Sequence, residues 1–277
     1  MAIGKLELKS RIRLIESTKK ITKAMQLVSA SKLKKQKSFM EEYKIYVYYM
    51  RGMVDKILSS MNEKHKYTTK ANGVVYTIVF TSDMGLCGGY NTSIYRLLKD
   101  LEGELVVIGS RGNDWCKLHH KQVVKSYINM ADDTVYNQLS RLISDILKRY
   151  DKQEISEIRI LYTQFVNAVT FEPRLETILP LQTCNQIHKD CKETIYEPSQ
   201  EEILEPLVLM YLRSILYNYY LESKTSEQAS RRMAMETATN SAQELVEELE
   251  LFFHKARQAE ITQEITEIVG GVMEGGN

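Results

Sequence analysis

Apolar residues recur with the period of a helix at both ends of the chain, and in short strand-like runs between the ends. Residues 6–61 contain no proline, and one set in this region recurs at alternating spacings of four and three residues. That spacing predicts a single long helix with an apolar seam suited to a partner helix. The seam consists of Leu14, Thr18, Ile21, Met25 and Val28.

The C-terminal part of the chain predicts a second, longer helix. Residues 207–269 contain neither proline nor glycine, and a second seam recurs at the same spacings: Ala238, Ala242, Leu245, Leu249, Phe252, Ala256 and Ala259. At 1.5 Å per residue such a helix would be about 90 Å long, too long to be buried in one domain, so it must project. We expect the two terminal helices to pair antiparallel, the longer one to extend past its partner, and the tail from Gly270 onward to fray.

The middle of the chain alternates between strands and helices. Runs rich in β-branched and aliphatic residues predict buried strands at 74–80, 105–108 and 158–162, with a weaker candidate at 123–124. Helical patterns between them cover 92–101 and 135–150. This alternation predicts βαβ units and a mostly parallel sheet. The stretch that follows is interpreted as a connector because it contains all the prolines of the chain: Pro173, Pro180, Pro198 and Pro206.

These elements together predict the fold class. We expect an α/β protein with long helices, in which an antiparallel coiled coil of the two terminal helices carries an inserted Rossmann-like parallel-sheet domain. The predicted boundaries are 1–66 for the N-terminal helix, 67–200 for the α/β head with its connector, and 201–277 for the C-terminal helix.

Charge and apolar stretches narrow the function classes. The 37 Lys and Arg residues against 36 Asp and Glu give a net charge of +1, so no global field favours nucleic acid. The N-terminus runs directly into charged, periodic sequence and looks like neither a signal peptide nor a transit peptide. The longest apolar stretch, 207–221, is interrupted by Arg213 and Asn218 and is too short to span a bilayer. We expect a chain that does not itself cross a membrane.

No metal or catalytic site is predicted. The cysteines, Cys87, Cys116, Cys184 and Cys191, form no C-x-x-C pair. A redox or metal pair of Cys184 and Cys191, with His188 between them, is the alternative to ordinary reduced thiols, which we favour. The remaining candidates have no companions at ligand or catalytic spacing: His119, His120 and His254. Asp132 and Asp133 are interpreted as a helix N-cap region and Trp115 as a packing residue.

A glycine-rich loop, residues 81–91, follows the first predicted strand and opens a helix. Such turns can bind phosphate, but this one lacks the Gly-Lys-Ser/Thr of a P-loop. A dinucleotide site would also need an acidic residue after the second strand, where Gly109, Ser110, Arg111 and Gly112 stand instead. Arg111 could accept a 2′-phosphate, which leaves an NADP site open. The favoured interpretation is a tight turn that needs glycine backbone angles.

The N-terminal helix carries a basic face that includes Lys19, Lys20, Lys23 and Lys32. It is either a solvated surface or a docking surface for an acidic protein. Nucleic acid is disfavoured, because no aromatic residues are interleaved with these lysines.

Three motifs, in order along the chain, resemble the gamma subunit of F-type ATP synthases, the central rotor shaft. The N-terminal motif runs from Arg11 through Lys20-Ile21-Thr22-Lys23-Ala24-Met25 to Leu33, and the middle motif is Gly85-Leu86-Cys87-Gly88-Gly89-Tyr90-Asn91. The C-terminal motif includes Ser226-Glu227-Gln228-Ala229, Arg231, Ala238-Thr239-Asn240, Lys255-Ala256-Arg257-Gln258-Ala259 and residues 261–270. Met84 departs from the family pattern, where a basic residue usually precedes the middle motif.

The resemblance implies a function. One copy of the chain would turn inside a hexamer of alternating alpha and beta subunits, with the epsilon subunit and the membrane ring of c subunits as further partners. Ion flow through the ring would drive ATP synthesis on the beta subunits. The chain itself would be non-catalytic and hold no cofactor, and its association with a bacterial cell membrane would be peripheral, on the cytoplasmic side.

The resemblance also assigns residues. Met25 matches a methionine near the beta-subunit lever, and Arg231, Gln258 and Thr262 match positions tied to coupling. Arg257 and Gln258 match a pair that contacts a loop of beta. The basic face, with Lys19, would then meet an acidic lever segment of beta through weak, exchangeable contacts. The rival hypothesis is an NADP-binding α/β enzyme with a coiled-coil oligomerisation arm.

Overall fold

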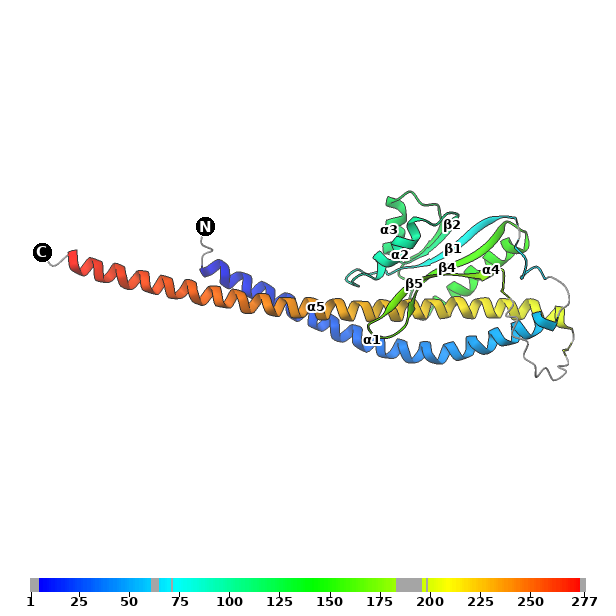
Figure 1. Cartoon of the computed structure of the whole chain (residues 1–277), viewed down its shortest axis with the longest axis horizontal. Helices are drawn as coiled ribbons and strands as arrows, with labels where there is room; N and C mark the ends of the chain where they lie inside the picture. Colours follow the sequence, from blue (N-terminus) through cyan, green and yellow to red (C-terminus); the bar gives the residue numbers. More distant parts are fainter. Residues whose placement is uncertain (1–4, 61–64, 71, 183–195, 198, 275–277) are drawn as a thin grey trace. The chain divides into compact units, whose positions relative to one another are not determined.

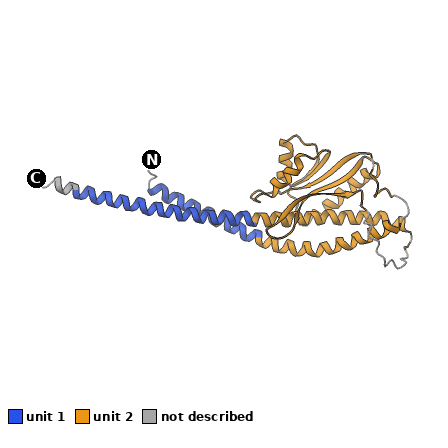
Figure 2. Ribbon diagram, in the orientation of Figure 1, with its two compact units in different colours: residues 1–29, 232–277 blue, residues 30–231 orange. Residues whose placement is uncertain are grey.

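The computed structural model describes residues 5–60, 65–70, 72–182, 196–197 and 199–274, and it divides into two compact units (Figure 2). Unit 1 comprises Met1–Ser29 and Arg232–Asn277, and unit 2 comprises Ala30–Arg231. The elements in chain order are α1 (Lys5–Ser60), β1 (Val74–Phe80), α2 (Tyr90–Lys99), β2 (Glu104–Ile108), α3 (Ser110–Leu118), β3 (Val123–Tyr127), α4 (Val135–Asp151), β4 (Ile155–Phe165), β5 (Phe171–Leu179) and α5 (Gln200–Glu274).

Unit 2 is built around a five-stranded sheet of order β3-β2-β1-β4-β5 (Figure 1). The pairs β1·β2, β2·β3 and β1·β4 are parallel, whereas β4·β5 is antiparallel. Parallel strands need a crossover between them, and the helices α2, α3 and α4 supply it. The prediction of a mostly parallel α/β sheet between two long helices is confirmed.

Both faces of the sheet are covered, because its central strands are apolar on both sides. On one face Val79, Leu105 and Val107 pack with residues of α2 and α3, including Ile94 and Cys116. On the other face Ile78, Phe80, Val106 and Ile108 join a larger core with residues of α1, α4 and α5. Successive strand residues point to opposite faces, so these continuous apolar runs bury both.

Two elements of unit 2 differ from the prediction. The strand β5 lies in the stretch interpreted as a connector, where Pro173 and alternating charged residues hid it. Proline is tolerated there because β5 is an edge strand. The helix α3 was not predicted, since its nine residues begin after Gly109 and include a glycine, Gly112. Asp132 and Asp133 do not cap α4, whose N-cap is Thr134 without a side-chain hydrogen bond.

Both predicted terminal helices are present, and the C-terminal one extends beyond the stretch without proline and glycine, 207–269. The helix α5 begins at Gln200 and continues through Pro206, which we had placed in the connector. It also continues through Gly270 and Gly271 to Glu274, so the expected fraying from Gly270 is wrong.

Within unit 1 the two helices run antiparallel. Lys5 forms an ion pair with Glu260 at 2.8 Å, Lys19 donates to the Gln243 side chain, and the hydroxyls of Thr22 and Thr239 are 2.8 Å apart. As the α1 number rises, the α5 number falls by nearly the same amount. Within unit 2 the two helices are also in contact, because Lys44 lies 2.9 Å from Glu222 and Arg51 donates to the hydroxyl of Tyr211 at 3.2 Å.

The contact face of this helix pair is offset from the predicted seams. Leu14, Ile21 and Val28 are exposed, whereas the half-buried α1 residues of unit 1 include Ile12, Ile15, Lys19, Thr22, Met25 and Gln26. On α5, Leu245 and Phe252 are exposed, and Val246 and Phe253 lie on the more buried face instead. Met25 of the α1 seam and Ala242, Leu249 and Ala256 of the α5 seam do lie on the more buried face. The prediction failed at the other positions because it followed apolar residues, while part of the interface is polar.

Candidate functional site

The residues assigned to partner contact fall into two environments. Met25 is half-buried in unit 1, and Arg257, Gln258 and Thr262 are exposed on α5. The Thr262 hydroxyl donates to the Gln258 carbonyl of its own helix at 2.9 Å. Arg231 differs from all of them, because it is buried in unit 2.

The basic face is open to solvent except at one residue. Lys20, Lys23 and Lys32 are exposed, whereas Lys19 is half-buried and donates to Gln243 across the helix pair. A lysine engaged within the chain is less available to an external partner. The exposed members can still attract an acidic surface.

Unit 1 exposes apolar side chains along both helices. On α1 these are Leu6, Leu14, Ile21, Leu27 and Val28, of which Leu14, Ile21 and Val28 recur every seven residues on one face. On α5 they are Leu245, Leu251, Phe252, Ile261, Ile265, Ile268 and Val269. Because Glu260 pairs with Lys5, the start of the described part of α1, the α5 residues beyond it have no helix opposite them there. Many exposed apolar side chains close together are typical of a surface that another protein covers.

The first three N–H groups of α3 are already bound within the chain. A helix N-terminus binds anions through its unpaired N–H groups. Here Ser110 N–H donates to the Asp83 carboxylate at 3.0 Å, Arg111 N–H to the Ser82 carbonyl at 3.1 Å, and Gly112 N–H to the Thr81 hydroxyl at 3.1 Å. The Asp83 carboxylate thus lies where an anion would bind at the start of α3. This argues against an NADP phosphate at that helix end.

Asp83 is a residue whose importance the sequence did not reveal. The same Oδ1 atom that accepts from Ser110 also accepts from Asn129 N–H at 3.0 Å, and Oδ2 lies 3.9 Å from the Lys224 ammonium on α5. The carboxylate therefore ties the loop after β1 to α3, to the end of β3 and to α5. An acid just before a glycine-rich turn was the available signal.

We expect Asp83→Ala to lower the free energy of unfolding by about 2–4 kcal/mol, because it leaves two backbone N–H groups without acceptors. Asp83→Asn keeps one acceptor oxygen and should cost about 1 kcal/mol. Urea unfolding followed by circular dichroism measures both. The control is Asp114→Ala, an exposed residue of the same α3, which should change little. Equal stability of Asp83→Ala and wild type would contradict this role.

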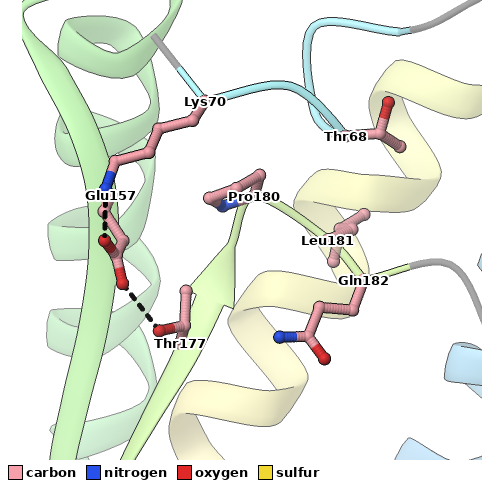
Figure 3. A pocket seen from close by; sticks show the side chains of 7 residues that line it. All are labelled: Thr68, Lys70, Glu157, Thr177, Pro180, Leu181 and Gln182. Atoms are coloured by element: carbon pink, nitrogen blue, oxygen red, sulfur yellow. Dashed lines mark hydrogen bonds and ion pairs between the residues drawn. The ribbon is translucent and has the colours of Figure 1, made fainter. Parts of the chain in front are cut away.

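An open pocket of about 450 Å³ lies beside the start of β4. Figure 3 shows it lined by Thr68, Lys70, Glu157, Thr177, Pro180, Leu181 and Gln182. Its one carboxylate is already engaged. Glu157 accepts two hydrogen bonds from Arg159 at 2.7 and 2.9 Å, one from Thr177 at 2.8 Å and one from Lys70 at 3.2 Å. The pocket offers no free acid or nucleophile for chemistry.

Glu157 should make stability depend on acid pH. The hydrogen bonds from Arg159 lower the pKa of Glu157 from its ordinary value of 4.5 to about 2. Its contribution is therefore complete above pH 4.5 and is lost as the pH falls toward 2. We expect Glu157→Gln to reduce the free energy of unfolding by roughly 1–3 kcal/mol at pH 7, and by less at pH 3. Urea unfolding at both pH values tests this.

The control for Glu157 is Glu172→Gln on β5. Glu172 lies 3.6 Å from Arg174, and both side chains are about half exposed, so this pair should contribute little. A loss from Glu157→Gln that was the same at pH 7 and pH 3 would contradict the pKa argument.

The other sequence candidates supply no site. Cys87 and Cys116 are free and buried, and burial raises the pKa of Cys116 to about 11. Cys184, His188 and Cys191 lie outside the described residues. Trp115 stacks between Tyr95 and His119, with centroid distances of 5.1 and 4.0 Å, as expected of a packing residue. Over the described residues, no cluster of His, Cys, Asp and Glu could hold a metal ion, and no helix is long and apolar enough to cross a membrane.

Comparison with known proteins places the chain among relatives of one kind. The model of a family described as ATP synthase matches residues 5–273. A protein named ATP synthase gamma chain from Mycoplasma capricolum subsp. capricolum is 37% identical over 271 residues, covering 95% of this chain and 96% of that protein. One of the same name from Ruminiclostridium cellulolyticum is 36% identical over 290 residues and covers 98% of each chain.

Solved structures share the fold. A chain from the rotor of the Euglena gracilis mitochondrial ATP synthase superposes with a TM-score of 0.66 at 14% identity, covering 92% of this chain and 97% of that one. A chain from the central stalk and c-ring of the Tetrahymena thermophila mitochondrial ATP synthase gives 0.60 at 21% identity, covering 79% and 99%. At these identities the likeness concerns the fold alone.

Proposed function

The chain belongs to the family of ATP synthase gamma chains, and we propose that it turns as the central shaft inside a hexamer of alternating alpha and beta chains. Ion flow through a ring of c subunits would rotate the ring and the shaft together. The asymmetric surface of the helix pair would meet each beta subunit differently and drive it through its nucleotide-binding states. One copy serves each complex, and an epsilon subunit accompanies it.

The observation that carries this proposal is the set of exposed apolar side chains on both helices of unit 1. Leu14, Ile21 and Val28 on α1, and Phe252, Ile261 and Ile265 on α5, remain uncovered after the two helices have packed on each other. An isolated enzyme would gain nothing from such surfaces, whereas a shaft enclosed by other subunits has them covered in the complex.

We further propose that the chain is non-catalytic and that ATP chemistry takes place on the beta subunits. Association with the membrane would be peripheral, through the c-ring, on the cytoplasmic side of a bacterial membrane. The predicted division of the chain at residues 66 and 200 stays a prediction.

Partner contact would use Met25, Arg257, Gln258 and Thr262 together with the exposed lysines of the basic face. Many of these side chains are long and solvated, so each contact with beta would be weak. A shaft that passes three beta subunits in each turn needs contacts that form and break easily, because one tight pair would hold it at a single beta subunit.

The test is affinity purification of the tagged chain from mild-detergent extracts of its own cells, with mass spectrometry of the copurifying proteins and an ATPase assay. We expect alpha, beta, epsilon and c subunits in one active complex. A homo-oligomer that carried bound nucleotide and none of these partners would overturn the proposal and favour the NADP-binding enzyme.

A further inference from the structure

Arg231 is placed where it can hardly reach another protein. Its side chain is only 7% exposed, and its contacts lie within unit 2. The guanidinium Nη2 donates to Glu227 at 2.8 Å, to the Met84 carbonyl at 3.2 Å and to the Gly85 carbonyl at 3.4 Å. A residue this buried cannot act by direct contact with a partner, so any effect on coupling must pass through what it holds.

What it holds is the tip of the glycine-rich loop. Met84 and Leu86 are 65% and 63% exposed, so the tip presents two large apolar side chains to solvent. Leu86 has a φ of 60°, in the left-handed region that costs a residue with a side chain about 1 kcal/mol or more. Such a conformation persists only where surrounding contacts determine it.

Several of those contacts come from α5. Next to Arg231, the Ser230 hydroxyl donates to the Cys87 carbonyl at 2.6 Å. Consecutive α5 residues therefore bind the carbonyls on both sides of Leu86. Within the loop, the Ser82 hydroxyl also donates to the Met84 carbonyl at 2.7 Å, but it cannot connect the tip to the helix.

The charges around Arg231 are balanced. Glu227, whose side chain is 5% exposed, accepts from Arg231 and lies 3.0 Å from the Lys224 ammonium, which in turn lies 3.9 Å from Asp83. Removing Arg231 alone leaves these four side chains with one excess negative charge. Removing Arg231 and Glu227 together returns their net charge to zero. The two changes separate the charge from the hydrogen bonds to the loop.

We propose that Arg231 is a positioning residue that acts on coupling from inside the chain, by holding the Met84–Leu86 loop tip against α5. The effect on coupling rests on the proposed function, whereas the hold on the loop does not. The apolar tip would then be a further contact point of the shaft with the surrounding subunits.

The first test uses the full chain alone. Cys87 is buried at the base of the tip, so its modification by N-ethylmaleimide, followed by peptide mass spectrometry, reports release of the loop. We expect Arg231→Gln to raise the labelling rate of Cys87 at least tenfold without raising that of Cys116, which reports global unfolding in the same molecule. The double variant Arg231→Gln with Glu227→Gln should stay equally reactive at Cys87, because it restores charge but not the hydrogen bonds.

Two variants complete the design. Arg232→Gln, at the neighbouring residue whose 3.4 Å ion pair with Glu236 lies on the α5 surface, should leave Cys87 protected. Arg231→Lys keeps the charge and one donor and should restore part of the protection. Unchanged Cys87 labelling in Arg231→Gln, or full protection in the double variant, would overturn the hold on the loop.

The second test uses the assembled complex in vesicles. Arg231→Gln and the double variant should both pump several-fold fewer ions per ATP hydrolysed than wild type, and Arg232→Gln should not. Reactive Cys87 together with normal coupling would overturn the role of the tip in coupling. If no complex formed with the wild-type chain, the proposed function would fail, while the labelling result would stand.

Discussion

Met25→Lys is expected to uncouple the complex without unfolding the chain. Met25 is half-buried on α1, in the turn after the exposed Ile21 and on the same helix as the exposed basic residues Lys20 and Lys23. A lysine there adds a positive charge where the family resemblance brings the acidic lever of beta. An ion pair in a partly desolvated interface stabilises one orientation of the shaft by roughly 1–3 kcal/mol. A stabilisation of about 1.4 kcal/mol already slows rotation out of that orientation about tenfold.

The measurement is the number of ions pumped per ATP hydrolysed in reconstituted vesicles, together with the thermal unfolding of the isolated chain. We expect a several-fold fall in the ratio and little change in unfolding temperature. Met25→Leu, which keeps size and apolar character, serves as the control and should couple normally. Normal coupling in Met25→Lys would show that this position does not face the lever.

The sheet and its helices were largely predictable because their signals are local. The run from Val74 to Phe80 is β-branched and apolar without interruption, and it forms β1 with the predicted bounds. In α4 the apolar residues repeat with a helical period, and the buried set includes Leu139, Ile143 and Ile146. Where each short window carries its own burial pattern, no knowledge of distant residues is needed.

The helix interface was predicted only in part, and the reason lies in its chemistry. A seam inferred from apolar periodicity selects Leu14 and Ile21, but the two helices meet through pairs such as Thr22 with Thr239. Some of the apolar residues that the pattern detected, including Leu14 and Ile21, are exposed in this chain. A sequence records every surface that is buried in the assembly and does not say which partner buries it.

The loop around Asp83 could not have been derived from spacing. Its carboxylate accepts from Ser110 and Asn129, which follow it by 27 and 46 residues, and these contacts exist only once three parallel strands have brought their carboxyl ends together. The sequence indicated a turn of the kind that can bind phosphate. In the folded chain the Asp83 carboxylate of that turn accepts a hydrogen bond from the start of α3. Long-range hydrogen bonds of this kind depend on the completed sheet.

The β2–α3 turn gives the sharpest test of that interpretation. Gly109 has a φ of 111°, and a Cβ built there would lie 2.4 Å from the Thr81 carbonyl oxygen, a backbone atom that cannot move aside cheaply. We expect Gly109→Ala to lower the free energy of unfolding by roughly 2–5 kcal/mol, from backbone strain and overpacking together. Thermal and urea unfolding of the full chain measure this loss.

The matched control for Gly109→Ala is Gly52→Ala in the C-terminal part of α1, where a Cβ would meet nothing within 4 Å. That substitution should stabilise the chain by about 0.5–1 kcal/mol, since alanine loses less conformational entropy in a helix. The opposite signs separate a glycine that packing requires from one that the helix merely tolerates. A dinucleotide site makes a different prediction, because glycines kept open for a ligand could accept a methyl group in the empty protein. Wild-type stability of Gly109→Ala would therefore make the turn a candidate binding site again. A large loss of stability would mean that Thr81 already occupies the space beside Gly109.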